Sequence, residues 1–108
     1  MRNKPVFRRR AAENDIQDIL DYYCREDSPE TASRFWDALE LAIGLISRQP
    51  AAGSPRYAQE LNLPGLRYRL VPRFPYLIFY TATSDGVDIW RVFHAQRDIP
   101  ASMSDTNS

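Results

Sequence analysis

The sequence is poor in the residue types that most often build covalent, metal or cofactor sites. Its 108 residues include one cysteine, Cys24, and one histidine, His94, so no intrachain disulfide can form. We expect Cys24 to be a small buried apolar side chain in a reducing compartment. The four glycines form no phosphate-binding loop, and no metal-ligand cluster or nucleophile elbow is present. The sequence therefore implies neither a cofactor nor a metal.

Long apolar runs are also missing. The longest, Tyr76 to Tyr80, is far too short to span a bilayer. The basic stretch from Met1 to Arg10 is not followed by the apolar segment of a signal peptide. We therefore predict a cytoplasmic protein with no membrane partner.

Neither sign of charge is in excess, because 14 basic residues balance 14 acidic residues, yet the charges are unevenly placed. Residues 1–10 carry five bases and no acid, and residues 11–48 carry nine acids and three arginines. Residues 56–97 reverse this with six arginines and three acids. A protein that binds bare DNA normally has a larger positive excess, because phosphate neutralisation supplies most of the affinity. We expect contact with DNA only indirectly, through a protein partner.

Apolar spacing predicts two helices early in the chain. Residues 12–23 repeat apolar side chains at steps of three and four, which places them on one helical face. Ser28 and Pro29 are a typical helix start, and a second apolar stripe follows until Pro50 ends it. The link at residues 26–28 is so short that the two helices must form an antiparallel hairpin.

The second half of the chain predicts strands. Prolines and glycines make residues 50–65 a loop, after which residues 66–71, 74–82 and 87–94 read as strands, the last two joined by a turn at 84–86. A short strand at residues 5–9 precedes the helices. The predicted fold is α+β, with an N-terminal strand and an antiparallel helical hairpin packed on a three- to four-stranded antiparallel sheet. It forms one domain over residues 1–100, with a flexible tail at 101–108.

Several short sequence motifs, taken in order, resemble those of one toxin family. They are Arg9-Arg10-Ala11-Ala12, Asp15-Ile16-Gln17-Asp18-Ile19, Tyr22-Tyr23, Ser28-Pro29, Pro50-Ala51-Ala52-Gly53, Leu63-Pro64-Gly65-Leu66-Arg67, Phe74 to Tyr80, and Arg91 to Asp98. Together they resemble the ParE branch of the ParE/RelE toxin superfamily over about Val6 to Pro100. The resemblance implies a type II toxin that inhibits DNA gyrase by protein–protein binding and is neutralised by a ParD-like antitoxin.

Basic side chains of the predicted sheet are the candidate contacts with the target. Arg91 interrupts an otherwise apolar strand, so it is the arginine that most needs a specific partner. A structural role is favoured for His94, which sits at the end of the last strand. For the arginines, the alternative to a cationic surface that binds the target is a solvated sheet face with a few ion pairs. The candidate set is Arg67, Arg69, Arg73, Arg91, His94 and Arg97.

Three side chains of the second predicted helix are candidates for binding the antitoxin: Trp36, Leu41 and Leu45. Leu41 and Leu45 lie off the apolar stripe, so packing against one neighbour does not require them. Trp36 is expected in the core. If Leu41 and Leu45 were both buried in the monomer, the hypothesis of an antitoxin groove would fail.

Two other functions remain open from the sequence. One is a ribosome-dependent mRNA endonuclease of the RelE type, in which Arg67, Arg73, Arg91 and His94 would act on the RNA. Arginine is a poor general base because it stays protonated, which weighs against this alternative and makes an enzyme the less favoured class. The other is a binding module without toxicity.

Overall fold

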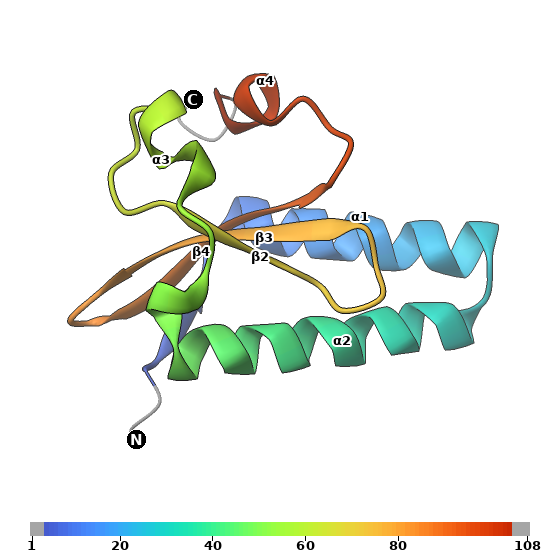
Figure 1. The fold of residues 1–108 in the computed structure, drawn as a ribbon. Helices are drawn as coiled ribbons and strands as arrows, with labels where there is room; N and C mark the ends of the chain where they lie inside the picture. The colour runs from blue at the N-terminus through green and yellow to red at the C-terminus, as the bar shows by residue number, and fades with distance from the viewer. Residues whose placement is uncertain (1–3, 105–108) are drawn as a thin grey trace.

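The computed structural model describes residues 4–104, which fold into an α+β arrangement (Figure 1). The elements in chain order are β1 (Val6–Arg8), α1 (Arg10–Glu26), α2 (Pro29–Arg48), a 3-10 turn (Pro50–Ala52), α3 (Arg56–Glu60), β2 (Arg67–Leu70), β3 (Tyr76–Thr83), β4 (Gly86–His94) and α4 (Ile99–Ser104).

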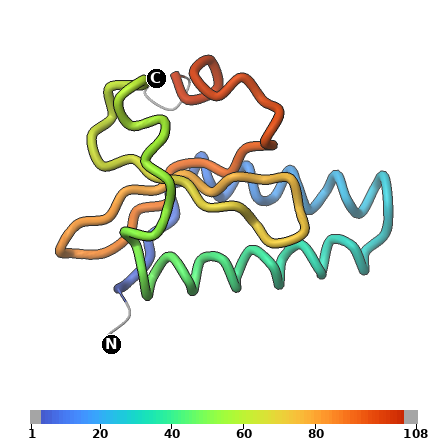
Figure 2. Tube along the Cα trace, in the orientation of Figure 1, coloured from blue at the N-terminus to red at the C-terminus, as the bar shows by residue number. Residues whose placement is uncertain are grey.

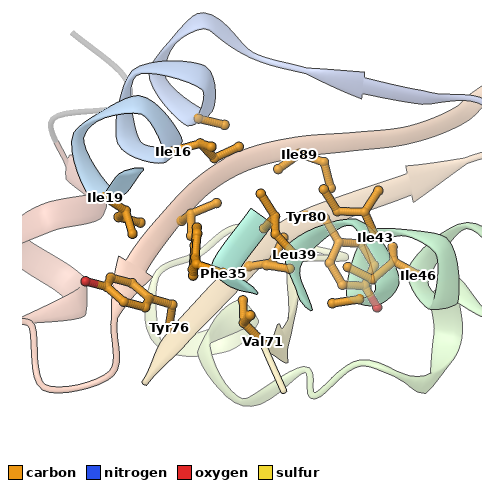
Figure 3. Packing of buried hydrophobic residues seen from close by; sticks show 14 of the residues in the cluster. Ile16, Ile19, Phe35, Leu39, Ile43, Ile46, Val71, Tyr76, Tyr80 and Ile89 are labelled. Atoms are coloured by element: carbon orange, nitrogen blue, oxygen red, sulfur yellow. The ribbon is translucent and has the colours of Figure 1, made fainter. Parts of the chain in front are cut away.

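The two long helices form the predicted hairpin. The Ser28 hydroxyl accepts a hydrogen bond from the Thr31 N–H at 3.2 Å, and Pro29 follows as the first residue of α2. The hydroxyl satisfies one of the free N–H groups at the helix start, and proline, which has no N–H, leaves no donor unsatisfied at its own position. Side chains of α1 and α2 meet the sheet in one apolar cluster, in which Phe35, Leu39 and Tyr80 are completely buried (Figure 3). The helical stripe read from the sequence is therefore the face that packs on the sheet.

The sheet has the order β1-β4-β3-β2. Strands β2, β3 and β4 form the predicted antiparallel meander, whereas β1 pairs with β4 in the parallel direction. The expectation of a wholly antiparallel sheet is therefore wrong at β1. The physical reason is that a helical hairpin separates β1 from the meander, so its direction follows from how the hairpin packs and not from a turn.

A second apolar cluster lies on the face of the sheet opposite the helical hairpin. Figures 1 and 2 show α3 and α4 on the side of the sheet away from α2. The buried members of this second cluster come from β3, β4, α4 and the residue before β2: Leu66, Leu77, Phe79, Phe93, Ile99 and Met103. The sheet is thus covered on both faces, by long helices on one and by short elements on the other.

Three local expectations are wrong. The loop predicted at residues 50–65 contains a 3-10 turn and α3, and residues 101–104 of the predicted tail belong to α4, where Met103 is buried. Residues 105–108 lie outside the described part. Cys24 is exposed on α1 and not buried. The short helices depend on contacts with the sheet, which local composition does not reveal.

Candidate functional site

A groove runs between α2 and the turn that joins β2 to β3. Its volume is about 840 Å³, and its walls comprise Asp27, Thr31, Arg34, Asp37, Ala38, Leu41, Pro72, Arg73 and Phe74. Leu41 is 56% exposed, although it is a large apolar side chain on a helix that packs against a sheet. The lining of the groove therefore combines apolar side chains with charged groups of both signs.

The same surface continues along α2 toward β2. Leu45 lies one helical turn after Leu41 and is half-buried. Arg69 of β2 lies opposite Ile78, which belongs to the cluster under the helices, so Arg69 lies on the helix side of the edge strand. We call the surface formed by Leu41, Leu45, Arg69 and Arg73 the α2–β2 face. Within it, the predicted antitoxin residue Leu41 and the predicted target residue Arg73 line the same groove.

Arg69 and Arg73 are the available cations of this face. Within residues 4–104, neither has a hydrogen bond or an ion pair to another side chain. Arg73 is exposed and has a φ of 68°, in the left-handed region that a non-glycine residue rarely adopts. The turn therefore holds the Arg73 side chain toward the groove at some cost in backbone energy.

The Arg67 side chain is engaged in a hydrogen bond within the chain. Its Nη1 donates to the carbonyl of Gly53 at 2.7 Å, and the Tyr80 hydroxyl donates to the carbonyl of Pro50 at 2.6 Å. Burial raises the pKa of the Tyr80 hydroxyl. A hydrogen bond between this hydroxyl and the backbone of Gly53, and the nearby positive charge of Arg67, partly oppose this rise. Arg67 therefore fastens residues 50–54 over the edge of the sheet, and it is not a free contact for a target.

Arg91 has the specific partner that its place in an apolar strand indicates. Its Nε and Nη2 donate to the two carboxylate oxygens of Asp15 at 2.7 and 2.8 Å. The Val92 N–H donates to the same carboxylate at 3.0 Å. Pairing of β1 with β4 ends at Ile89, so Asp15 covers a part of the β4 edge that no strand of residues 4–104 covers. Arg91 is thereby engaged within the chain.

His94 and Arg97 lie in another place, beside a hollow of about 260 Å³ between α1 and the end of β4. The His94 ring packs edge-on against Tyr76 with centroids 5.3 Å apart, and its Nδ1 accepts from the Gln96 N–H at 3.1 Å. Burial raises the pKa of Tyr76 to about 12, with further contributions from Tyr23 and Tyr22. These contacts fix the position of the His94 ring between Tyr76 and the turn after β4.

Trp36 does not lie in the core and does not share the groove with Leu41. It is 38% exposed, and it borders a separate small hollow between α1 and α2, which Leu20 and Arg8 also line. The Arg8 guanidinium lies 5.5 Å above its ring. Five residues along a helix place two side chains well apart around its axis, which explains why Trp36 and Leu41 face different surfaces.

The four residues considered for RNA cleavage are not brought together. Arg67 lies opposite Tyr80 and Arg91 opposite Phe79, so the two arginines stand against neighbouring positions of β3 that face opposite sides of the sheet. His94 lies opposite Tyr76, three residues farther along the same strand. Among residues 4–104, no group of three or more His, Cys, Asp or Glu side chains is arranged to hold a metal. No helix in this part of the chain has the length and apolarity to cross a bilayer.

The fold belongs to a known class of toxins. A chain from a solved structure, described as "Chromosomal ParDE TA system from P. aeruginosa", superposes with a TM-score of 0.73 over 86% of this chain and 97% of that chain, at 20% identity. At this identity the likeness concerns the fold alone. No curated protein sequence matches the chain. Residues 6–99 match the family model described as ParE toxin of type II toxin-antitoxin system, parDE. The chain belongs to this family.

Proposed function

We propose that this ParE-type toxin inhibits DNA gyrase by direct protein–protein binding and that a ParD-like antitoxin neutralises it by occupying the α2–β2 face. The observation that carries the proposal is the groove that exposed Leu41 and unpaired Arg73 line together, with unpaired Arg69 on the helix side of β2. Because gyrase contact and antitoxin contact are assigned to the same face, an antitoxin bound there would exclude the target.

The chemistry of the face favours an amphipathic helix from the antitoxin. Leu41 and Leu45 are four residues apart, so they form an apolar row that a partner helix can match with side chains spaced three or four residues apart. Arg69 and Arg73 would attract carboxylates beside that row. A disordered antitoxin segment that folds on this surface can cover a large area, although its ordering reduces the net affinity.

The proposed contact between the toxin and gyrase is tested with a double substitution in the toxin. We expect Arg69→Ala/Arg73→Ala to reduce inhibition of gyrase supercoiling at least tenfold, since two charge-assisted contacts would be lost. Arg56→Ala is the matched control, because Arg56 is exposed, lies outside the groove and stacks on Tyr57. If the purified wild-type toxin neither inhibits supercoiling nor causes cleaved complexes with excess gyrase, the gyrase assignment is wrong.

Antitoxin binding is tested separately by calorimetry with a ParD-like antitoxin. Leu41→Ala/Leu45→Ala should weaken binding by more than tenfold, because both substitutions remove apolar area from the interface. Leu70→Ala is the control: Leu70 is 57% exposed, and it pairs with Leu77 of the opposite cluster, so it faces away from α2. Equal losses in the two variants would contradict an antitoxin site on the α2–β2 face.

A further inference from the structure

The turn that joins β2 to β3 has an arginine at the position that glycine fits best. The turn spans residues 71–74, and the Phe74 N–H closes it by donating to the Val71 carbonyl at 3.2 Å. Pro72 is its second residue, and Arg73, with a φ of 68°, is its third. This is the geometry of a type II turn, whose third residue needs a positive φ. Glycine adopts such a φ without steric cost, whereas any residue with a Cβ is strained there.

The surroundings of the turn hold this strained conformation in place. The Val71 N–H donates to the Tyr76 carbonyl and the Tyr76 N–H donates to the Phe74 carbonyl, both at 2.9 Å. The Phe74 ring also packs edge-on against Phe35 and Tyr23, with centroids 5.3 and 5.6 Å apart. The arginine cannot move to a relaxed φ without breaking these contacts, which is the condition under which strain persists in a folded chain.

The Arg73 side chain makes no polar contact within the chain that would offset this strain. Within residues 4–104, its guanidinium has no hydrogen bond, ion pair or ring contact. Two carboxylates, Asp27 and Asp37, line the same groove as Arg73, yet neither is paired with it. By its polar contacts the fold therefore gains nothing from an arginine at this position.

We infer that Arg73 anchors a carboxylate of the antitoxin in the groove, and that the chain keeps this arginine at the expense of its own stability. The inference rests on the proposed occupation of the α2–β2 face by the antitoxin. A residue that lowers the stability of the fold is expected where its side chain is needed for function. Arginine suits this role, because its guanidinium can bind a carboxylate through two parallel hydrogen bonds.

The other charges of the groove leave the carboxylate one place to bind. The helical wall carries Asp27 and Asp37 together with one cation, Arg34, which donates to the Thr31 hydroxyl at 3.1 Å. A carboxylate in the groove is attracted to Arg73 on the turn and repelled by the two acids of the helical wall. The matching antitoxin segment has an acidic residue on one flank of its apolar row and neutral or basic residues on the other.

Three substitutions at Arg73 separate the strain from the binding. Arg73→Ala removes the guanidinium and keeps the Cβ, so it should weaken antitoxin binding about tenfold and leave stability unchanged. Arg73→Gly should weaken binding equally, but it should raise the folding equilibrium constant roughly threefold and the unfolding midpoint by about 3–5 °C. Arg73→Glu reverses the charge and should bind more weakly than Arg73→Ala. The measurements are calorimetry with a ParD-like antitoxin and thermal and urea unfolding of the full chain.

Asn62→Gly is the matched control. Asn62 is also a non-glycine residue with a positive φ, 53°, but asparagine tolerates this region and Asn62 lies outside the groove. Its binding and stability should both stay close to those of the wild type. Added salt should weaken antitoxin binding more steeply in the wild type than in Arg73→Ala, because one ion pair is lost in the variant.

Three results would each overturn the inference: an Arg73→Gly variant no more stable than Arg73→Ala, wild-type affinity in both variants, or equal salt dependence in Arg73→Ala and the wild type. The proposed function fails in a different way. If Leu41→Ala/Leu45→Ala weakens binding and the Arg73 variants do not, the antitoxin occupies the face without the carboxylate contact. If neither set weakens binding, the antitoxin does not occupy the α2–β2 face.

Discussion

The Asp15 carboxylate accepts three hydrogen bonds from two residues at a part of the β4 edge that β1 does not cover. Its contacts with Arg91 and with the Val92 N–H join α1 to the edge of β4, and the side chains of Asp15 and Arg91 are 10% and 12% exposed. Removing one member of a buried pair leaves the other charge without compensation, and this loss exceeds the net stabilisation that the intact pair provides. The interaction therefore acts mainly to fix the position of α1 against the sheet.

Asp15→Ala should accordingly lower the free energy of unfolding by about 3–5 kcal/mol, because it removes the carboxylate that pairs with buried Arg91 and accepts from the Val92 N–H. The measurement is urea denaturation at neutral pH. Asp15→Leu/Arg91→Met is the matched control, since it removes both charges and should be much closer to the wild type. A loss below 1 kcal/mol in Asp15→Ala would show that the pair does not hold the helix.

At the residue scale, the features that could be predicted from the sequence were those that depend on residues close together along the chain. The Ser28 cap and the need of Arg91 for a partner were readable, because both follow from local chemistry. The identity of Asp15 as that partner was not readable, since the two residues are 76 positions apart. Trp36 and Cys24 were misplaced because periodicity gives the direction of a side chain and not how far its neighbours cover it.

At the element scale, the elements with strong internal signals were predicted and those that depend on the sheet were not. Helices α1 and α2 have apolar stripes and starting residues of their own, and the meander has a local turn. Helices α3 and α4 are only five and six residues long and form against the second cluster. The α2–β2 face was only partly predictable, because Leu41 on α2 and Arg73 after β2 are far apart in the sequence and line one groove only in the folded chain.

The segment that crosses the edge of β2 offers a test at this scale. A Cβ added at Gly53 would lie 2.1 Å from the Tyr80 hydroxyl and 3.0 Å from the Tyr68 carbonyl, so Gly53→Ala must displace residues 50–54. We expect a loss of about 1–3 kcal/mol, as is typical of overpacking, measured by thermal and urea unfolding. Gly44→Ala is the control, because its Cβ meets nothing closer than 3.7 Å and should stabilise α2 by roughly 0.5–1 kcal/mol. Equal effects in both variants would contradict a tightly held segment.

At the scale of the whole molecule, acidic and basic residues are concentrated in different parts of the structure. Acids dominate the helical hairpin, whereas arginines dominate the strands and the turn after β2. The α2–β2 face lies where these two regions meet, so a partner there encounters both an apolar row and charges of both signs. In the proposed complex, such a surface would orient a bound helix, because only one direction of the helix would place acidic side chains beside Arg69 and Arg73.

Occupation of this face should also stabilise the fold as a whole, by mass action. An antitoxin that binds only the folded toxin, present at 100 times its Kd, should raise the free energy of unfolding by about 2.7 kcal/mol. The measurement is thermal unfolding of the toxin across an antitoxin titration, in which the midpoint should rise by several degrees per kcal/mol for a domain of this size. Because the gain depends on the ratio of concentration to Kd, Leu41→Ala/Leu45→Ala should need proportionally more antitoxin to reach the same midpoint, whereas Leu70→Ala should follow the wild type. An unfolding midpoint that stays constant at saturating antitoxin would mean that the antitoxin binds the unfolded chain equally well, and neutralisation would then not occur through the folded α2–β2 face.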